Sequence, residues 1–311
     1  MGMATIFNVI DLERIRAAAE RARPHVHRTP MAPVEGALLK LECLQPTGSF
    51  KVRGFFAAAL ALPDEKRRKG LITVSAGNAA QACAYAAHSL GVQCRVVMYE
   101  TAPATKIDGV KRWGGTPMLM PRPELLDWLA NDGWKSEPEA FIHPFADPEV
   151  MAGHGGLGLE LLEDVPDLQT VVVGVGGGGL VSGIVTALGG QARIVAVEPE
   201  QAPAFSAGLA AGRSVRVETN TIADGLAPPF AGELALELCR GKVETVLVSE
   251  HEIAEGMRFL YARAKLACEP AGAAAAGAVL AGKVDAGPGV AVIVSGGNVD
   301  PKQAAAILRE Q

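Results

Sequence analysis

Four consecutive glycines follow an apolar run near the middle of the chain, in the segment TVVVGVGGGG (170–179). The apolar part is typical of a buried strand in a parallel sheet, and the glycines lead into a helix that begins near Leu180. Adjacent glycines carry an entropic cost that packing alone seldom requires. Backbone N–H groups that lack a neighbouring Cβ and lie at a helix N-terminus bind phosphate well. We therefore predict a phosphate-binding loop rather than an ordinary tight turn.

Further apolar runs alternate with helical segments along the chain. Helices are expected at 11–23 and 79–90, and a capping-box spacing at Ser249 and Glu252 predicts another helix start. Continuous apolar strands between helices indicate a parallel sheet covered on both faces, hence an α/β fold. The strands cluster in two sets, which predicts two lobes with a cleft between them. The predicted strand segments are 71–78, 92–98, 116–120, 170–179, 192–198, 243–249 and 290–298.

Composition excludes several classes of protein. The net charge is −5 and no basic run is present, which argues against nucleic-acid binding. No uncharged apolar stretch reaches the ~18–20 residues of a membrane span, and the N-terminus lacks a signal-peptide core. The cysteines are odd in number and form no CxxC pair, so we expect buried free thiols in a reducing cytoplasm rather than disulfides or a zinc site. They are Cys43, Cys83, Cys94, Cys239 and Cys268.

A lysine in the segment PTGSFKVRG (46–54) is the strongest candidate for chemistry. Lys51 stands between Phe50 and a predicted helix rich in small residues. It would lie at the N-terminal end of that helix, where positive charge is disfavoured. A surface lysine is the ordinary alternative. An amine held near a phosphate loop and an aromatic ring has the setting for a Schiff base with a carbonyl cofactor.

The glycine loop by itself also fits a dinucleotide site. Residues 174–179 satisfy the pattern G-x-G-x-x-G, and Glu198 ends the next strand near the ~20-residue offset of such sites. An NAD-binding Rossmann protein therefore stays open on this motif alone.

Six segments occur together in the order and spacing of one family. They are PTGSFKVRG, SAGN (75–78) with Gln81, GVGGGG, TIADG (221–225), CEPAG (268–272) and SGGNVD (295–300). From about residue 28 to residue 300 the chain resembles the fold-type II pyridoxal-phosphate enzymes, most closely the serine/threonine dehydratase and serine racemase branch. The resemblance implies two open, twisted, mainly parallel sheet lobes, as in the tryptophan synthase beta fold, with the cofactor in the cleft. It also implies a large cofactor-binding domain at 1–69 and 147–311 and a small mobile domain at 70–146.

The resemblance implies a role for each matching residue. Lys51 would form the Schiff base and remove the Cα proton of the substrate. Phe50 would pack on the pyridine ring, Asn78 would bind its 3-hydroxyl, and Ser295 would meet its nitrogen. The cofactor-binding residues implied are Phe50, Lys51, Asn78, Gly176, Gly177, Gly178, Gly179, Leu180, Gly225 and Ser295.

The same comparison implies a substrate side. Its residues are Ser75, Ala76, Gly77, Asn78 and Ala79, which would receive the carboxylate, and the catalytic residues implied are Lys51, Ser75 and Glu269. Because Ser295 is a neutral partner, the ring is a weaker electron sink and expulsion of a β-leaving group is favoured. The implied activity is α,β-elimination from a β-hydroxy amino acid such as threonine or serine, giving a 2-oxo acid and ammonia. A racemase, another β-eliminating lyase and an inactive cofactor-binding protein are the alternatives.

Several positions depart from the family pattern. Ala76 replaces the second serine of the racemases, which disfavours racemisation, and Ala79 replaces a common histidine, which leaves room for a bulkier or charged substrate. His154 replaces a glutamine and is either a substrate-side or a structural change.

The family's cation site is only partly matched. Glu198 and the backbone carbonyl of Ala202 match two of its ligands, whereas Ala204 stands where an aspartate is usual. A weakened divalent site or a monovalent cation is therefore expected. Family members are usually dimers or tetramers. The glycines of segment 153–158 are interpreted as helix stops and a domain hinge.

Overall fold

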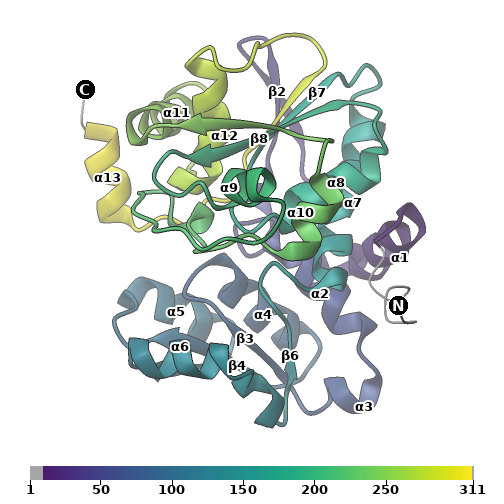
Figure 1. Cartoon of the computed structure of the whole chain (residues 1–311), viewed down its shortest axis with the longest axis vertical. Coiled ribbons are helices and arrows are strands. Elements are labelled where there is room, and N and C mark those ends of the chain that lie inside the picture. The colour runs from purple at the N-terminus through teal and green to yellow at the C-terminus, as the bar shows by residue number, and fades with distance from the viewer. Residues whose placement is uncertain (1–9, 310–311) are drawn as a thin grey trace.

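The computed structural model describes residues 10–309 and contains two separate sheets, one in each half of the molecule (Figure 1). The larger sheet has the order β1-β2-β10-β7-β8-β9 and the smaller one β5-β4-β3-β6. The strands of the larger sheet are β1 (Met31–Val34), β2 (Ala37–Lys40), β7 (Thr170–Gly174), β8 (Arg193–Pro199), β9 (Glu244–Val248) and β10 (Val290–Ile293). Those of the smaller sheet are β3 (Leu71–Val74), β4 (Cys94–Tyr99), β5 (Thr116–Met120) and β6 (Ala140–Phe141).

Parallel pairing dominates both sheets, as the apolar strand pattern predicts. β10 lies between β2 and β7, with Ile293 opposite Lys40 and Val290 opposite Thr170. The pair β1/β2 is antiparallel and is joined by a two-residue turn with positive φ at Glu35 and Gly36. This hairpin is missing from the sequence predictions because each strand has four residues and β1 contains a proline, so neither shows a clear period.

Helices cover the sheets, and two of them begin at capping residues that the sequence indicates. The Asp11 side chain accepts from the N–H of Arg14 at the start of α1, and the capping box of Ser249 and Glu252 opens α11. The helices are α1 (Leu12–Ala22), α2 (Lys51–Ala61), α3 (Asp64–Arg67), α4 (Asn78–Ser89), α5 (Ala104–Arg112), α6 (Arg122–Ala130), α7 (Pro148–Asp164), α8 (Gly179–Leu188), α9 (Ala204–Ala211), α10 (Glu233–Cys239), α11 (Glu250–Ala262), α12 (Pro270–Leu280) and α13 (Pro301–Arg309).

Short 3₁₀ turns complete the described chain. They are η1 (Arg23–His25), η2 (Glu42–Leu44), η3 (Gly133–Ser136) and η4 (Asp224–Leu226). All five cysteines are buried and unpaired, which confirms the expectation of free thiols. Within residues 10–309, no helix has the length and apolar character needed to cross a membrane.

The interpretation of segment 153–158 as helix stops and a hinge is wrong, because these residues lie inside the continuous helix α7. Their glycines allow neighbouring helices to approach closely. A Cβ at Gly153 would stand 2.5 Å from the Cβ of Ala57 in α2, and one at Gly183 in α8 would stand 2.5 Å from the backbone nitrogen of Gly155. Close packing of helices, and not flexibility, explains this glycine run.

We expect Gly183→Ala to destabilise the protein, because its Cβ would meet the backbone of α7, which cannot move aside as a flexible side chain would. The free energy of unfolding, measured with urea, should fall by about 1–3 kcal/mol. Gly287→Ala is the matched control, since nothing lies within 4 Å of that Cβ position, and its effect should stay within about 0.5 kcal/mol. Equal stability of the two variants would contradict the packing argument.

Candidate active site

Backbone hydrogen bonds bring the lysine segment and the last strand together. The N–H of Phe50 donates to the Ser295 carbonyl over 3.1 Å, and the N–H of Gly297 donates to the Gly48 carbonyl over 2.8 Å. Ser49 and Gly296 also form an isolated antiparallel bridge. Two motifs that are far apart in the sequence are thus joined, and the start of α2 lies beside the SGGN turn.

The Lys51 amine is held among apolar and aromatic groups. Its Nζ donates to the Pro144 carbonyl over 2.9 Å and lies 5.0 Å from the centre of the Phe50 ring. Burial lowers the pKa of Lys51 to about 8, against a smaller opposing effect of the Glu269 carboxylate. Burial, together with the nearby Lys51 charge, lowers the pKa of His143 to about 4, so this imidazole is neutral. The site therefore makes the uncharged form of the Lys51 amine more abundant near neutral pH than it is for an exposed lysine.

The glycine loop presents a set of free donors. Within the described chain, no oxygen accepts a hydrogen bond from the N–H of Gly176, Gly177 or Gly178. The first N–H groups of α8 also have no intrahelical acceptor, as at any helix start, and these include Gly179 and Leu180. Such a cluster of N–H groups fits a phosphate.

The backbone of this loop requires glycine. Gly178 has a φ of 90°, and a Cβ there would stand 2.6 Å from that of Ala235. A Cβ at Gly177 would stand 2.3 Å from the ring of Phe145. The segment that contains Pro144 and Phe145 therefore touches both the glycine loop and the Lys51 amine.

Asn78 and Glu269 meet directly across the boundary between the two halves. Asn78 begins α4 in the half that holds the smaller sheet, and its Nδ2 donates to Oε1 of Glu269 over 2.5 Å. Burial raises the pKa of Glu269 to about 8, and the hydrogen bond from Asn78 opposes this shift. A carboxyl group in this setting exchanges a proton near neutral pH.

The other predicted residues lie around these groups. Ser295 is buried, and Gly225 packs against CEPAG, with its Cβ position 2.9 Å from the Cβ of Ala271. The Ser75 hydroxyl accepts from the N–H of Gly77 over 3.0 Å. Nothing lies within 4 Å of a Cβ placed at Gly77, so the SAGN loop faces open space there. Ala76 is half-buried and Ala79 is buried at the start of α4.

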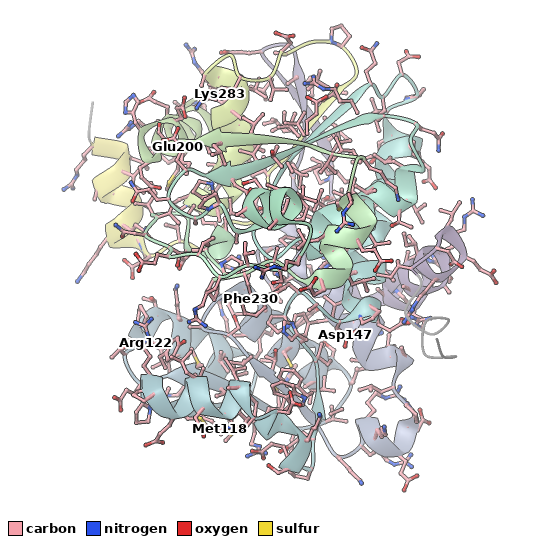
Figure 2. All side chains as sticks on the ribbon, in the orientation of Figure 1. Met118, Arg122, Asp147, Glu200, Phe230 and Lys283 are labelled. Atoms are coloured by element: carbon pink, nitrogen blue, oxygen red, sulfur yellow. The ribbon has the colours of Figure 1, made fainter. Side chains whose placement is uncertain are left out.

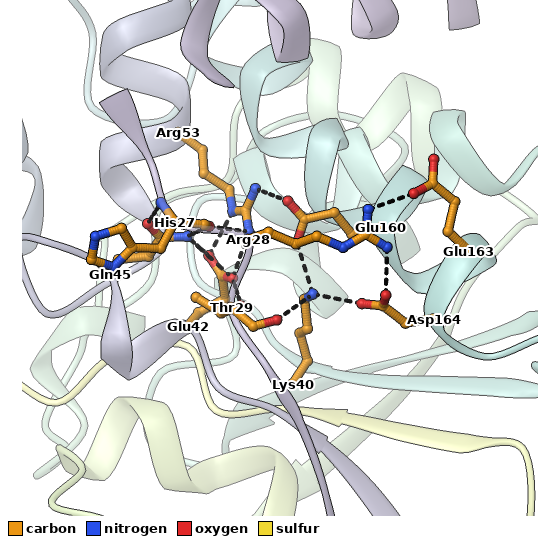
Figure 3. A network of polar contacts seen from close by, with 10 residues as sticks. All are labelled: His27, Arg28, Thr29, Lys40, Glu42, Gln45, Arg53, Glu160, Glu163 and Asp164. Carbon is orange, nitrogen blue, oxygen red and sulfur yellow. Dashed lines mark hydrogen bonds and ion pairs between the residues drawn. The ribbon is translucent and has the colours of Figure 1, made fainter. Parts of the chain in front are cut away.

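A buried ionic network supports α2 behind Lys51 (Figure 3). Arg53 Nε donates to Glu42 Oε2 and its Nη1 to Glu160 Oε1, both over 2.7 Å. Lys40 pairs with Glu160 at 2.7 Å and with Asp164 at 3.0 Å. Burial alone would raise the pKa of Glu42, but the charge and hydrogen bonds of Arg53 keep that pKa below its usual value. The network links β2, η2, α2 and α7 and fixes the helix that carries Lys51.

His154 lies behind Phe50 rather than in an open part of the site. It is fully buried in α7, and its ring packs edge-on against Phe50 with centroids 4.8 Å apart. A Cβ at Gly54 would stand 2.5 Å from this imidazole. Of the two interpretations of His154, the geometry favours the structural one.

Glu198 caps a helix. Its carboxylate accepts from the N–H of Phe205 over 2.7 Å and from the N–H of Ser206 over 2.8 Å, at the start of α9. Ala202 can offer only its backbone carbonyl, as the resemblance implies, and Ala204 supplies no side-chain oxygen. Residues 10–309 contain no group of three or more His, Cys, Asp or Glu that could hold a metal ion. Glu198 thereby fixes the start of α9 at Phe205, and the ring of Phe205 lies against Gly178. Through this contact Glu198 supports the glycine loop.

Sequence reasoning missed three contributors to the site. Asn298 donates to Asn78, and Pro144 and Phe145 contact Lys51 and the glycine loop. Asn298 lies in the SGGNVD motif, so the sequence did place it near the site. Pro144 acts through its backbone carbonyl, which no side-chain pattern reveals.

Comparisons with known proteins agree with this arrangement. Residues 22–296 match the family described as "Pyridoxal-phosphate dependent enzyme". The chain is 40% identical to the L-threonine ammonia-lyase of Thermotoga maritima, over 94% of this chain and 76% of that protein. The chain belongs to this family of pyridoxal-phosphate-dependent enzymes.

Two solved structures are also similar to it. Maize serine racemase superposes with a TM-score of 0.88 at 35% identity, covering 95% of this chain and 96% of that one. The T.th. threonine deaminase has a TM-score of 0.86 at 38% identity, covering 94% of this chain and 99% of that one. The two-sheet α/β fold is thus the fold-type II arrangement, and the glycine loop belongs to a pyridoxal-phosphate enzyme rather than to an NAD-binding protein.

The residues present fit this cofactor. The free N–H groups after β7 suit its phosphate, and an amine with a lowered pKa suits its aldehyde. Phe50 offers an aromatic face beside that amine.

We expect pyridoxal phosphate to react with the apoprotein at a rate that rises with pH and is half-maximal near pH 8. The reason is that only the neutral amine of Lys51 is nucleophilic, and its pKa is about 8. Stopped-flow absorbance between pH 6.5 and 9.5 measures this rate. Glu269→Gln should move the midpoint to lower pH, because the carboxylate raises the pKa of Lys51. A midpoint near 10, as for an exposed lysine, would refute the assignment.

Proposed function

We propose that the protein is an ammonia-lyase that eliminates the β-hydroxyl group of an amino acid such as threonine or serine and releases a 2-oxo acid and ammonia. The observation that carries this proposal is the half-buried Lys51 amine, which has a lowered pKa and lies between the Phe50 ring and a segment in contact with the glycine loop. Similarity to threonine ammonia-lyase over most of the chain supports it.

Each part of the site has a task in this reaction. When bound in this site, pyridoxal phosphate would supply the electron sink that acidifies the Cα–H bond of the amino acid. The N–H groups of the glycine loop hold the phosphate. Lys51 accepts the Cα proton, for which a pKa of about 8 suits a base working near neutral pH. The neutral hydroxyl of Ser295 would leave the ring nitrogen without a charged partner, which favours loss of the β-hydroxyl group. That group leaves as water after taking up one proton, while Lys51 takes the Cα proton.

The open side of the site is proposed to receive the substrate. The loop of Ser75, Ala76 and Gly77 faces free space at Gly77. The N–H groups of Ser75 and Gly77 already have acceptors. We therefore infer that those of Ala76 and Asn78, which have none among the described residues, would bind the carboxylate. Small side chains at Ala76 and Ala79 leave room for a β-substituent larger than the methyl group of threonine. A bulkier or charged β-hydroxy amino acid is therefore included in the proposal.

Racemisation is the second candidate, because serine racemases are similar to the chain nearly as closely as threonine ammonia-lyases are. A racemase needs a proton donor on the face of Cα opposite the lysine. Ala76 stands where the racemase branch has a serine, and its methyl group has no proton to give. This residue supports elimination over racemisation.

The proposal extends to the setting of the enzyme. We infer a cytoplasmic location, supported by five unpaired cysteines. We also infer a homodimer or homotetramer and a small mobile domain at 70–146, because both are usual in the family. A cation would compete with the backbone N–H groups of α9 for Glu198.

Purified holoenzyme given a panel of β-hydroxy amino acids of both configurations should release a 2-oxo acid and an equal amount of ammonia. Coupled assays for both products, with chiral chromatography of the remaining amino acid, measure elimination and racemisation together. Lys51→Ala should reduce release at least ~10³-fold, because it removes both the cofactor linkage and the base. Lys69→Ala, at an exposed lysine before β3, is the matched control and should retain full activity.

Three outcomes are decisive for this proposal. An enantiomer formed faster than 2-oxo acid would replace it with racemisation. A bound cofactor with no turnover of any panel member would replace it with the inactive-binder alternative. Turnover that survives Lys51→Ala would overturn the role of that lysine.

Ala76→Ser should create a proton donor on the opposite face and so raise enantiomer formation from serine by roughly tenfold, within the range of general acid catalysis. The elimination rate should change by less than that. Chiral chromatography of serine after incubation with each variant measures the ratio of the two activities. An unchanged ratio would show that position 76 does not decide between them.

A further inference from the structure

A line of hydrogen bonds connects the lysine segment to Glu269 through two asparagines. Asn298 Nδ2 donates to the Thr47 carbonyl over 2.7 Å and to Oδ1 of Asn78 over 2.8 Å. Asn78 Nδ2 then donates to Glu269 Oε1 over 2.5 Å. The line runs from the loop before Lys51, through the SGGN turn, to the first residue of α4 and on to CEPAG. It joins four of the six motifs and crosses between the two halves of the molecule.

The Thr47 carbonyl determines which atom donates and which accepts in every hydrogen bond of this line. A side-chain amide has two chemically similar ends, so its orientation follows from its partners. The Thr47 backbone carbonyl only accepts, which requires the NH₂ end of Asn298 to face it. The second N–H of Asn298 then donates to Asn78, which requires the oxygen of Asn78 to face Asn298. The NH₂ end of Asn78 is left for Glu269 and for the ligand side.

Close packing holds Asn298 in this position. A Cβ at Gly48, where φ is 73°, would stand 2.6 Å from Oδ1 of Asn298. A Cβ at Gly296 would likewise stand 2.1 Å from Oε1 of Glu269. The glycines that flank both ends of the line thus leave space for these two polar side chains.

We propose that Asn298 is a positioning residue that holds the amide of Asn78 in one orientation, so that Asn78 acts on the bound cofactor only as a hydrogen-bond donor. With its oxygen engaged by Asn298 and one N–H engaged by Glu269, Asn78 keeps one N–H for the 3-oxygen of pyridoxal phosphate. A donor at this point stabilises negative charge on that oxygen. The inference rests on the cofactor and not on which amino acid is the substrate.

The test measures cofactor binding to apoprotein rather than turnover. Asn298→Ala removes the bond that orients Asn78 without adding charge, and Asn298→Asp replaces it with repulsion between two oxygens. We expect the dissociation constant for pyridoxal phosphate to rise several-fold in the first variant and about tenfold or more in the second. The pH at which the visible band of the bound cofactor titrates should move upward in Asn298→Ala. Asn220→Asp, at an exposed site, is the surface control and should bind as the unchanged protein does.

A double variant separates positioning from mere structural support. If Asn298 acts through Asn78, then Asn298→Ala should add less than about twofold to the dissociation constant in an Asn78→Ala background. Thermal unfolding of each apoprotein identifies any variant that is not folded, and the Asn298→Ala series carries the test if Asn298→Asp does not fold. Fully additive effects, or unchanged affinity and band in Asn298→Ala, would overturn the proposal. If the unchanged holoenzyme turns over no hydroxy amino acid, the proposed function is refuted. The binding results for the Asn298 and Asn78 variants do not depend on that outcome.

Discussion

Two cations stand in the first turn of α2, at the end of a helix where positive charge is least favourable. They are treated in opposite ways. Arg53 is surrounded by the carboxylates of Glu42 and Glu160, so its charge is fully paired inside the protein. Lys51 has only a backbone carbonyl and a more distant carboxyl group, so burial lowers its pKa and the Glu269 carboxylate offsets only part of that shift. The paired residue fixes the helix, and the unpaired residue gains reactivity from the same position.

This contrast organises the packing around the site. The Glu42–Arg53–Glu160 network ties α2 to β2 and α7, and the helices around α7 approach closely because glycines line their contacts. Breaking one member of a buried pair leaves an uncompensated charge, which costs more than the pair itself contributes. The charges behind α2 therefore define one position for the helix, and small residues in α7 allow that position to be reached. Figure 2 draws the side chains of the described residues, with Phe230 and Asp147 labelled near the boundary between the two halves.

The sequence predicts an element correctly where the local propensity of its residues agrees with their tertiary contacts. Strand β5 has the bounds that its sequence predicts, the capping box at Ser249 is present, and the glycine loop after β7 supplies the donors that its sequence indicates. The run 153–158 misleads because glycine breaks a helix by propensity, whereas these glycines are kept in α7 by helix contacts that only the folded chain reveals.

Side-chain roles are harder to predict for a similar reason. His154 faces the back of Phe50, Glu198 caps α9, and Asn298 orients Asn78, and each of these depends on a partner distant in sequence. Motif spacing indicates which segments meet but not which atoms face one another. The residues whose chemistry is intrinsic, such as a lysine beside a phenylalanine, can be named from the sequence. Those whose role comes from a partner cannot.

The position of β10 between β2 and β7 has a consequence for synthesis of the chain. Strands of the smaller sheet all lie between residues 71 and 141, so that half can pair its strands while the rest is still being made. β2 is synthesised before β10, and its parallel pairing cannot form until the chain has been made as far as Val290. Until then β2 and β7 present open edges, which are templates for association with other chains. Among the described residues, β10 is the last strand to be made, and it is the one that joins β2 to β7 in the larger sheet.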